Sequence, residues 1–200
     1  MVQVNRLVVG DATAASRWDA FVRACPEATF CHLSGWGRAL EGVFGHETHF
    51  LQAVQGDRIT GVLPLAYVQS RLFGNSLTSL PFCVYGGVAA EDAASAQALE
   101  AAAEALAQRL GVPHLELRHT TRRHPDWPEQ DLYVTFRKAI TADDDANMNA
   151  IPRKQRAMVR KGIKNGLVST VDDSVDRFFA LYADNVHRHG TPALPKRWFQ

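Results

Sequence analysis

The sequence has almost no excess of charge of either sign. It carries 22 Lys and Arg against 21 Asp and Glu, which leaves a formal net charge of +1 over 200 residues. Proteins that bind nucleic acid or anionic membranes over a broad surface carry a large positive excess. Composition therefore excludes a general polyanion-binding surface, and any such partner would have to meet a local patch.

Long hydrophobic runs are also missing. The longest stretch without a charged residue, from Leu72 to Ala90, is interrupted by Gly74, Pro81 and two later glycines, so it predicts strands and loops instead of a membrane span. The first residues contain no basic segment followed by an apolar core, so no secretory signal is predicted. We expect a cytoplasmic protein without an integral membrane segment, with the inner face of the membrane as one place where it could act.

The residues that build metal and redox sites are few. Three cysteines, Cys25, Cys31 and Cys83, form no CxxC spacing, and we interpret all three as buried thiols. The eight histidines include two close pairs, each without the third ligand that a tetrahedral metal site needs. No spacing marks a nucleophile and its base, so the metal prediction is none and the catalytic residues are unknown.

The first 140 residues predict an α+β fold with a mainly antiparallel mixed sheet flanked by helices. Alternating runs and helical spacing indicate elements in this order: strand Val2–Val9, a helix capped by Asp11 or Thr13 and ended by Pro26, helix Ser34–Phe44, a hairpin of His49–Val54 and Ile59–Val68, strand Ser76–Leu80, helix Asp92–Leu110, and strands Val112–Arg118 and Leu132–Lys138. Pro64 lacks a backbone donor, so we expect a bulge or interruption there.

Composition changes after residue 140. An acidic start, Thr141–Asp145, is followed by six Lys or Arg and no acid within twelve positions, Arg153 to Lys164. Neighbouring charges of opposite sign are thus segregated along the chain, which favours a boundary between two units, 1–140 and 141–200.

The basic block predicts an amphipathic helix over Arg153 to Asn165. Pro152 suits a first turn and Gly166 suits a stop. At 100° per residue one side carries Met158, Val159, Gly162, Ile163 and Leu167. The other side carries Arg153, Lys154, Arg160, Lys161 and Lys164, with Arg156 near the border. Such a helix is most often a solvated surface, but like charges three and four residues apart repel each other. We therefore expect an anionic group, from the protein or from a ligand, to compensate them.

Two segments resemble a known family. The segment "GVLPLAYVQSRLFGNSLTSLPFCVYGGV", Gly61 to Val88, is similar to the two strands and the Pro-Phe-x-x-Tyr-Gly-Gly turn of FemAB-like proteins. The segment that begins "RKQRAMVRKGIKNGLVSTVDD" and ends "PKRWF" resembles the start of their second half. The likeness covers nearly the whole chain and is strongest to the FemAB-like proteins associated with exosortase and extracellular-polysaccharide systems.

The resemblance implies a GNAT-like first domain followed by the start of a second, similar domain, so we expect the chain to be part of a longer protein. It implies an acyl or aminoacyl transferase that acts on a cell-envelope, exopolysaccharide or peptidoglycan precursor when full length. Acyl-CoA and aminoacyl-tRNA are both left open as acyl donors. The Gln/Arg-x-x-Gly-x-Gly/Ala loop with which GNAT enzymes bind the pyrophosphate of CoA does not occur in this sequence.

The predicted substrate-binding residues lie in the two segments that carry the resemblance. The turn contributes Tyr85, Gly86 and Gly87, since glycine lets backbone approach a ligand closely. The basic helix contributes cations for the phosphates of a small-molecule or lipid-linked substrate, with tRNA as a further partner: Arg153, Lys154, Arg156, Arg160 and Lys161. Arg118 and His119 end a predicted strand and are candidates to face a cleft. The alternative is a non-catalytic scaffold that uses the basic helix to bind RNA or a protein.

Overall fold

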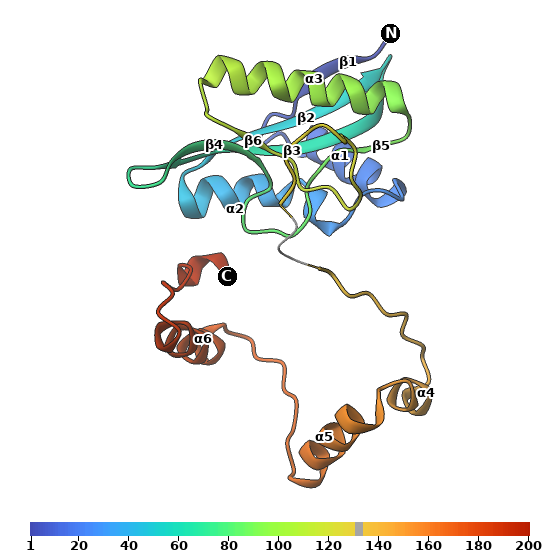
Figure 1. Ribbon diagram of the computed structural model, residues 1–200, viewed down its shortest axis with the longest axis vertical. Helices are drawn as coiled ribbons and strands as arrows, with labels where there is room; N and C mark the ends of the chain where they lie inside the picture. Colours follow the sequence, from blue (N-terminus) through green and yellow to red (C-terminus); the bar gives the residue numbers. More distant parts are fainter. Residues whose placement is uncertain (131–133) are drawn as a thin grey trace. The chain divides into compact units, whose positions relative to one another are not determined.

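The computed structural model describes residues 1–130 and 134–200. It forms two compact units, Met1–Pro125 and Asp126–Gln200. Figure 1 shows the sheet and its covering helices in the first unit, and helices joined by extended chain in the second. That the second unit opens a further acyltransferase domain stays a prediction.

The first unit is built on one mixed sheet in the order β1-β2-β3-β4-β6. Its main strands are β1 (Gln3–Arg6), β2 (Glu47–Gln55), β3 (Arg58–Ser70), β4 (Gly74–Ser79) and β6 (Leu115–Glu116), and the short β5 (Ala89–Ala90) pairs with β3. All pairings are antiparallel except the last, in which β4 and β6 run parallel. The predicted α+β class with a mainly antiparallel sheet is confirmed.

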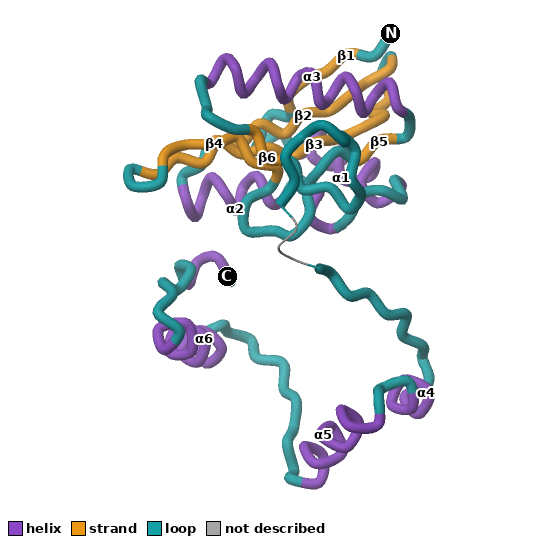
Figure 2. The backbone as a smooth tube through the Cα atoms, viewed as in Figure 1, coloured by secondary structure: helices purple, strands orange, loops and turns teal. Residues whose placement is uncertain are grey.

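Helices cover both faces of this sheet. In Figure 2, α3 (Ala93–Leu110) lies along one face, and α1 (Ala12–Ala24) and α2 (Gly35–Phe44) lie along the other. The cap expected at Asp11 is present, since its Oδ1 accepts from the amides of Thr13 and Ala14 at 2.9 and 3.0 Å. Gly45 ends α2 with a φ of 70°. These caps satisfy helix-end donors and define where each helix begins and ends.

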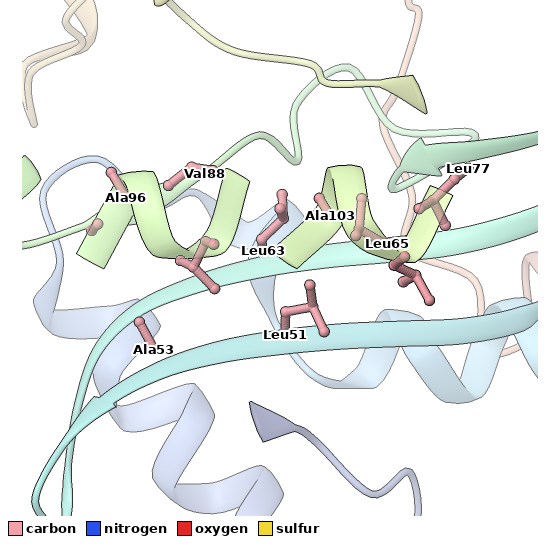
Figure 3. Packing of buried hydrophobic residues seen from close by; sticks show 11 residues of the cluster. Leu51, Ala53, Leu63, Leu65, Leu77, Val88, Ala96 and Ala103 are labelled. Atoms are coloured by element: carbon pink, nitrogen blue, oxygen red, sulfur yellow. The ribbon is translucent and has the colours of Figure 1, made fainter. Parts of the chain in front are cut away.

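The core follows from the alternation of side chains along β2 and β3. Leu51 and Leu63 point to one face, where they pack with Leu99 and Ala103 of α3, as Figure 3 shows for the labelled members. Phe50 points to the other face and stacks on Trp18 of α1 with ring centroids 5.5 Å apart. Each fully buried large apolar side chain contributes about 1.5–3 kcal/mol, so both helical layers are firmly held to the sheet.

The expected irregularity in the hairpin is displaced from Pro64. The register shifts between Ala53 and Val54, opposite Thr60, while Pro64 pairs with Phe50 inside a continuous β3. The Leu80 amide donates to the Pro64 carbonyl at 3.1 Å, so the backbone of Pro64 faces the side where the partner of β3 changes from β5 to β4. A residue without a backbone N–H donor is tolerated where the strand changes partners.

Three strands predicted from sequence are shorter or do not form. Of the predicted Val2–Val9, only Gln3–Arg6 forms a strand. The run Val112–Arg118 contributes only the two residues of β6. Leu132 and Tyr133 lie outside the described residues, and residues 134–138 form no strand, with Phe136 91% exposed. An alternating pattern becomes a strand only when a neighbouring strand takes up its backbone hydrogen bonds, and the described residues supply none for 134–138.

The second unit has helices but no core within its described part. Its elements are α4 (Asp144–Asn149), α5 (Arg153–Lys164), α6 (Asp176–Arg188) and the short 3-10 helix η2 (Lys196–Trp198). No described residue from 126 to 200 is buried. Phe178 and Tyr182 of α6 pack on Phe199 at 5.2 and 5.0 Å between ring centroids. No helix in the described part of the chain is both long and apolar enough to cross a bilayer.

Candidate functional site

A pocket of about 280 Å³ lies in the first unit, beside the turn that contains Tyr85 and Gly87. Because β4 and β6 are parallel, both strands end at the same edge of the sheet. The segments that follow them, 80–88 and 117–123, form much of the pocket wall. The remainder comes from Glu27 after α1 and from His32 in the short 3-10 helix η1 (Phe30–His32). Ligands of sheet proteins commonly bind at such carboxyl edges.

His32 holds the glycine turn through a hydrogen bond to its backbone. The Thr29 amide donates to His32 Nδ1 at 3.0 Å, so this nitrogen is unprotonated and the proton sits on Nε2, which donates to the Gly87 carbonyl at 2.9 Å. The imidazole is 3% exposed, and this burial lowers its pKa below the ordinary value. His32 is therefore a neutral positioning residue with both ring nitrogens engaged.

Gly87 is packed so closely that no side chain fits. Its amide donates to the Arg118 carbonyl at 2.8 Å. A Cβ at this position would lie 2.5 Å from His119 Nδ1 and 2.9 Å from the same carbonyl. The preceding Gly86 has a φ of 154° and a Cβ there would lie 2.7 Å from Leu80 Cβ. Gly87 thus lets the turn lie against the segment after β6, and Gly86 lets it lie against the end of β4.

His119 lines the pocket and has one ring nitrogen without a partner in the part of the chain that the structure describes. Its Nε2 atom is buried and has no hydrogen-bond partner among the described residues. Burial first, and then the positive charge of Arg123, lower the pKa of His119 to about 4. At neutral pH the imidazole is uncharged, so it can exchange hydrogen bonds with a ligand without the cost of a buried cation.

Glu100 fixes the loop that carries His119. This carboxylate lies on the core side of α3 and is 5% exposed. It accepts from Arg123 Nε at 2.7 Å and lies 3.3 Å from His124 Nε2. A buried carboxylate is stable only when it is paired, so Glu100 ties the end of this loop to α3 and orients the Arg123 guanidinium at the pocket wall.

Arg118 is a structural residue at the same edge. Its Nε donates to Glu116 Oε1 at 2.6 Å and its Nη1 to the Cys83 carbonyl at 2.5 Å. It thereby holds a turn in which two non-glycine residues, Leu80 and Phe82, have φ values of 46° and 68°. Backbone strain of this kind persists only where the surroundings enforce it and is common beside binding sites.

The three cysteines are free and buried, as expected. Burial, followed by the nearby Cys31, raises the pKa of the Cys83 thiol to about 12. A thiol with that pKa is protonated at neutral pH and is a poor nucleophile. Cys83 is therefore unsuited to covalent catalysis.

The second unit carries the predicted basic helix. α5 begins at Arg153, as predicted, and ends at Lys164, one residue before the expected end. No carboxylate of the described residues pairs with its cations Arg153, Lys154, Arg160, Lys161 or Lys164.

Arg156 differs from the other cations of α5. Its guanidinium donates to the carbonyls of Asn149 and Ile151 at 2.8 and 3.0 Å, where it joins the end of α4 to the start of α5. These bonds give Arg156 a structural task that competes with any role in phosphate binding.

The predicted site residues therefore fall into two groups. Tyr85 and Gly87 line the pocket, and Gly86 is buried beside it, whereas the basic helix belongs to the other unit. Sequence reasoning missed Glu27, His32, Glu100 and Arg123. No local signal could have found them, because they lie on elements that only the folded sheet brings to one edge.

Comparisons with known proteins give distant structural similarities. No family model and no curated protein matches the chain. It is similar to a transcriptional regulator from Bacillus halodurans C-125, with a TM-score of 0.41 and 13% identity over 70% of this chain and 100% of that one. It is also similar to a GNAT family acetyltransferase from Staphylococcus aureus subsp. aureus USA300_TCH1516, with a TM-score of 0.38 and 12% identity over 71% of this chain and 98% of that one.

Proposed function

We propose that the chain belongs to a FemAB-like acyltransferase of the GNAT type, which transfers an acyl or aminoacyl group to an amine of a cell-envelope or exopolysaccharide precursor. The observation that carries the proposal is the pocket at the edge of the parallel pair, where the unpartnered His119 Nε2 lies beside a glycine turn. The resemblance of the segments from Gly61 and from Arg153 to FemAB-like proteins supports it.

In this proposal the pocket holds the reacting groups. The acceptor amine attacks the carbonyl carbon of the donor, a C–N bond forms, the bond from carbonyl carbon to the sulfur of CoA or the ribose oxygen of tRNA breaks, and the amine proton passes to the leaving group. His119 is uncharged at pH 7 because its pKa is about 4, so in this proposal it orients the acceptor amine through a hydrogen bond. The backbone of Gly86 and Gly87 and the Tyr85 hydroxyl line the path of the acyl group.

The cations of α5 would bind the phosphates of the precursor. Arg153, Lys154, Arg160 and Lys161 carry this role in the proposal, since Arg156 is engaged with backbone carbonyls. A nucleotide-linked sugar and a lipid-linked sugar present the same phosphate chemistry. The lipid-linked form would bring the protein to the inner face of the membrane.

The test is transfer of a labelled acyl group from acyl-CoA or aminoacyl-tRNA to a nucleotide-linked amino sugar. We expect product with one of the two donors, and we expect His119→Gln to lower the rate by about 100-fold. His114→Gln, an exposed histidine outside the pocket, is the matched control and should leave the rate unchanged. Absence of product with either donor, or an unaltered His119→Gln enzyme, would overturn the proposal.

The non-catalytic alternative has one observation in its favour, the five cations of α5 that are unpaired within the described residues. A scaffold that binds RNA through them would show an affinity that falls steeply with salt, because each neutralised phosphate releases counterions. It would also be indifferent to His119→Gln. Transfer activity together with salt-independent RNA binding would exclude it.

A further inference from the structure

α5 combines two exposed surfaces that face in nearly opposite directions. At 100° per residue, the six cations from Arg153 to Lys164 centre on one side of the helix, and Met158, Val159, Gly162 and Ile163 centre on the other. Glutamate and aspartate are absent from the helix. A helix of this composition, with a strongly charged side and a modest apolar side, is the type that lies in a membrane interface.

The apolar side is open to solvent. Met158 and Ile163 are each 64% exposed, and Val159 is 40% exposed. The surface continues beyond the helix, since Leu167 and Val168 are 75% and 87% exposed. Exposed apolar groups gathered along one helix face and its continuation indicate an interaction surface, whereas scattered ones do not.

The charged side is uncompensated. Five cations have no carboxylate partner among residues 1–130 and 134–200, whereas the arginines of α6 are paired, Arg177 with Asp172 at 2.9 Å and Arg188 with Asp184 at 2.8 Å. Like charges three and four residues apart destabilise α5 until an anionic surface compensates them. The two helices therefore differ in a way that points to a ligand for α5 alone.

We propose that α5 binds the surface of an anionic lipid bilayer, with its cations among the headgroups and Met158, Val159 and Ile163 inserted at the headgroup–acyl boundary. A bilayer is the partner that satisfies both sides of the helix together. RNA would neutralise the cations and leave the apolar side in water. A second copy packed through the apolar side would bring two sets of six cations near each other, which opposes association.

This inference goes beyond the proposed phosphate binding and does not require the transfer reaction. It predicts that α5 adsorbs to lipid whether or not a sugar is attached to it. Each Lys or Arg near an anionic leaflet strengthens adsorption by about fivefold at low salt. Each apolar side chain that inserts adds to this by an amount that salt does not screen.

The experiment is co-sedimentation of the chain with vesicles of phosphatidylcholine alone and of equal parts phosphatidylcholine and phosphatidylglycerol. We expect binding to the anionic vesicles only. Lys161→Gln with Lys164→Gln should weaken it by about 25-fold, as two cations are lost. Met158→Gln with Ile163→Gln keeps the charge and the helix propensity, and it should weaken binding by about tenfold or more.

The matched control is Arg177→Gln with Arg188→Gln on α6, which removes the same charge from the same unit and should change vesicle binding by less than about twofold. Far-ultraviolet circular dichroism confirms that each variant keeps its helix content. The substituted side chains are at least partly exposed, so a loss of binding reports on the surface.

Three outcomes would overturn the inference. Equal binding to neutral vesicles would remove the role of charge. Vesicle binding by Met158→Gln/Ile163→Gln as strong as that of the wild type would show that the apolar side does not insert into the bilayer. The helix would then be a simple polyanion site, of the kind that RNA or soluble phosphates occupy. Concentration-dependent self-association that this variant abolishes, without vesicle binding, would assign the apolar side to a second copy. Affinity for a soluble nucleotide-linked sugar, measured in parallel by calorimetry, tests the proposed function separately.

Discussion

Replacing Gly87 by alanine is the most direct test of how the pocket is built. The added Cβ would lie 2.5 Å from His119 Nδ1 and 2.9 Å from the Arg118 carbonyl, and one of these neighbours is backbone that cannot rotate away. Overpacking of this kind costs about 1–3 kcal/mol. The hydrogen bonds of Gly87 to Arg118 and His32, at 2.8 and 2.9 Å, would also stretch, which adds about 1 kcal/mol.

The expected loss of unfolding free energy is therefore about 2–4 kcal/mol. With a urea dependence of about 2 kcal/mol per molar, the unfolding midpoint should fall by roughly 1–2 M. The measurement is urea unfolding at pH 7 followed by circular dichroism and tryptophan fluorescence. A second consequence is a displaced His119 ring, which should appear as a changed histidine signal in the nuclear magnetic resonance spectrum.

Gly42→Ala is the matched control. Gly42 lies inside α2 and a Cβ there would meet no atom within 4 Å, so alanine should leave stability unchanged or raise it by up to about 1 kcal/mol. If Gly87→Ala unfolds at the same urea concentration as the wild type, the close approach of the turn and the segment after β6 is wrong.

Three further predictions concern pH and packing. The pKa of His119 in the folded protein is about 4, below its unfolded value, so its contribution to stability is complete above about pH 6.5 and is lost as the pH falls toward 4. Discounted for the partial exposure of the ring, this loss of unfolding free energy is about 2 kcal/mol. His119→Gln should flatten this part of the pH–stability curve. Leu99→Ala should cost about 2–5 kcal/mol because Leu99 is fully buried between α3 and the sheet. Leu72→Ala, at an 87% exposed position, should cost less than about 0.5 kcal/mol in the same urea assay. Glu100→Ala leaves Arg123 without its buried partner and should cost about 3 kcal/mol, whereas Arg58→Ala, which breaks an exposed ion pair with Glu91, should cost less than about 1 kcal/mol; equal losses would show that the Glu100 pair is solvated.

Local patterns predicted the helices well because their signals lie within a few residues. Asp92 caps α3 by accepting from the Ser95 amide at 2.7 Å, and Gly111 ends it with a φ of 62°. The buried residues of α1, Trp18, Phe21 and Val22, recur at helical spacing within five positions. In each case the residue that sets the boundary and the residues that it affects are neighbours in the chain.

Strand predictions were less complete, because a strand depends on a partner elsewhere. The hairpin of β2 and β3 was predicted correctly, since its turn is local. The extent of β6 was overestimated, because only Leu115 and Glu116 find a partner in β4. The alternating pattern from Leu132 carries no information about its neighbours in the fold. It therefore could not predict that residues 134–138 lack a neighbouring strand among the described residues.

By itself the sequence determined the α+β class, the positions of α1, α2 and α3, the basic helix and the glycine turn, because these depend on interactions between residues close in the chain. Only the tertiary structure decided that His32, Glu100 and His119 meet around that turn. Their meeting depends on the parallel pairing of β4 with β6, which joins segments about forty residues apart, and no pattern within one segment specifies such a pairing.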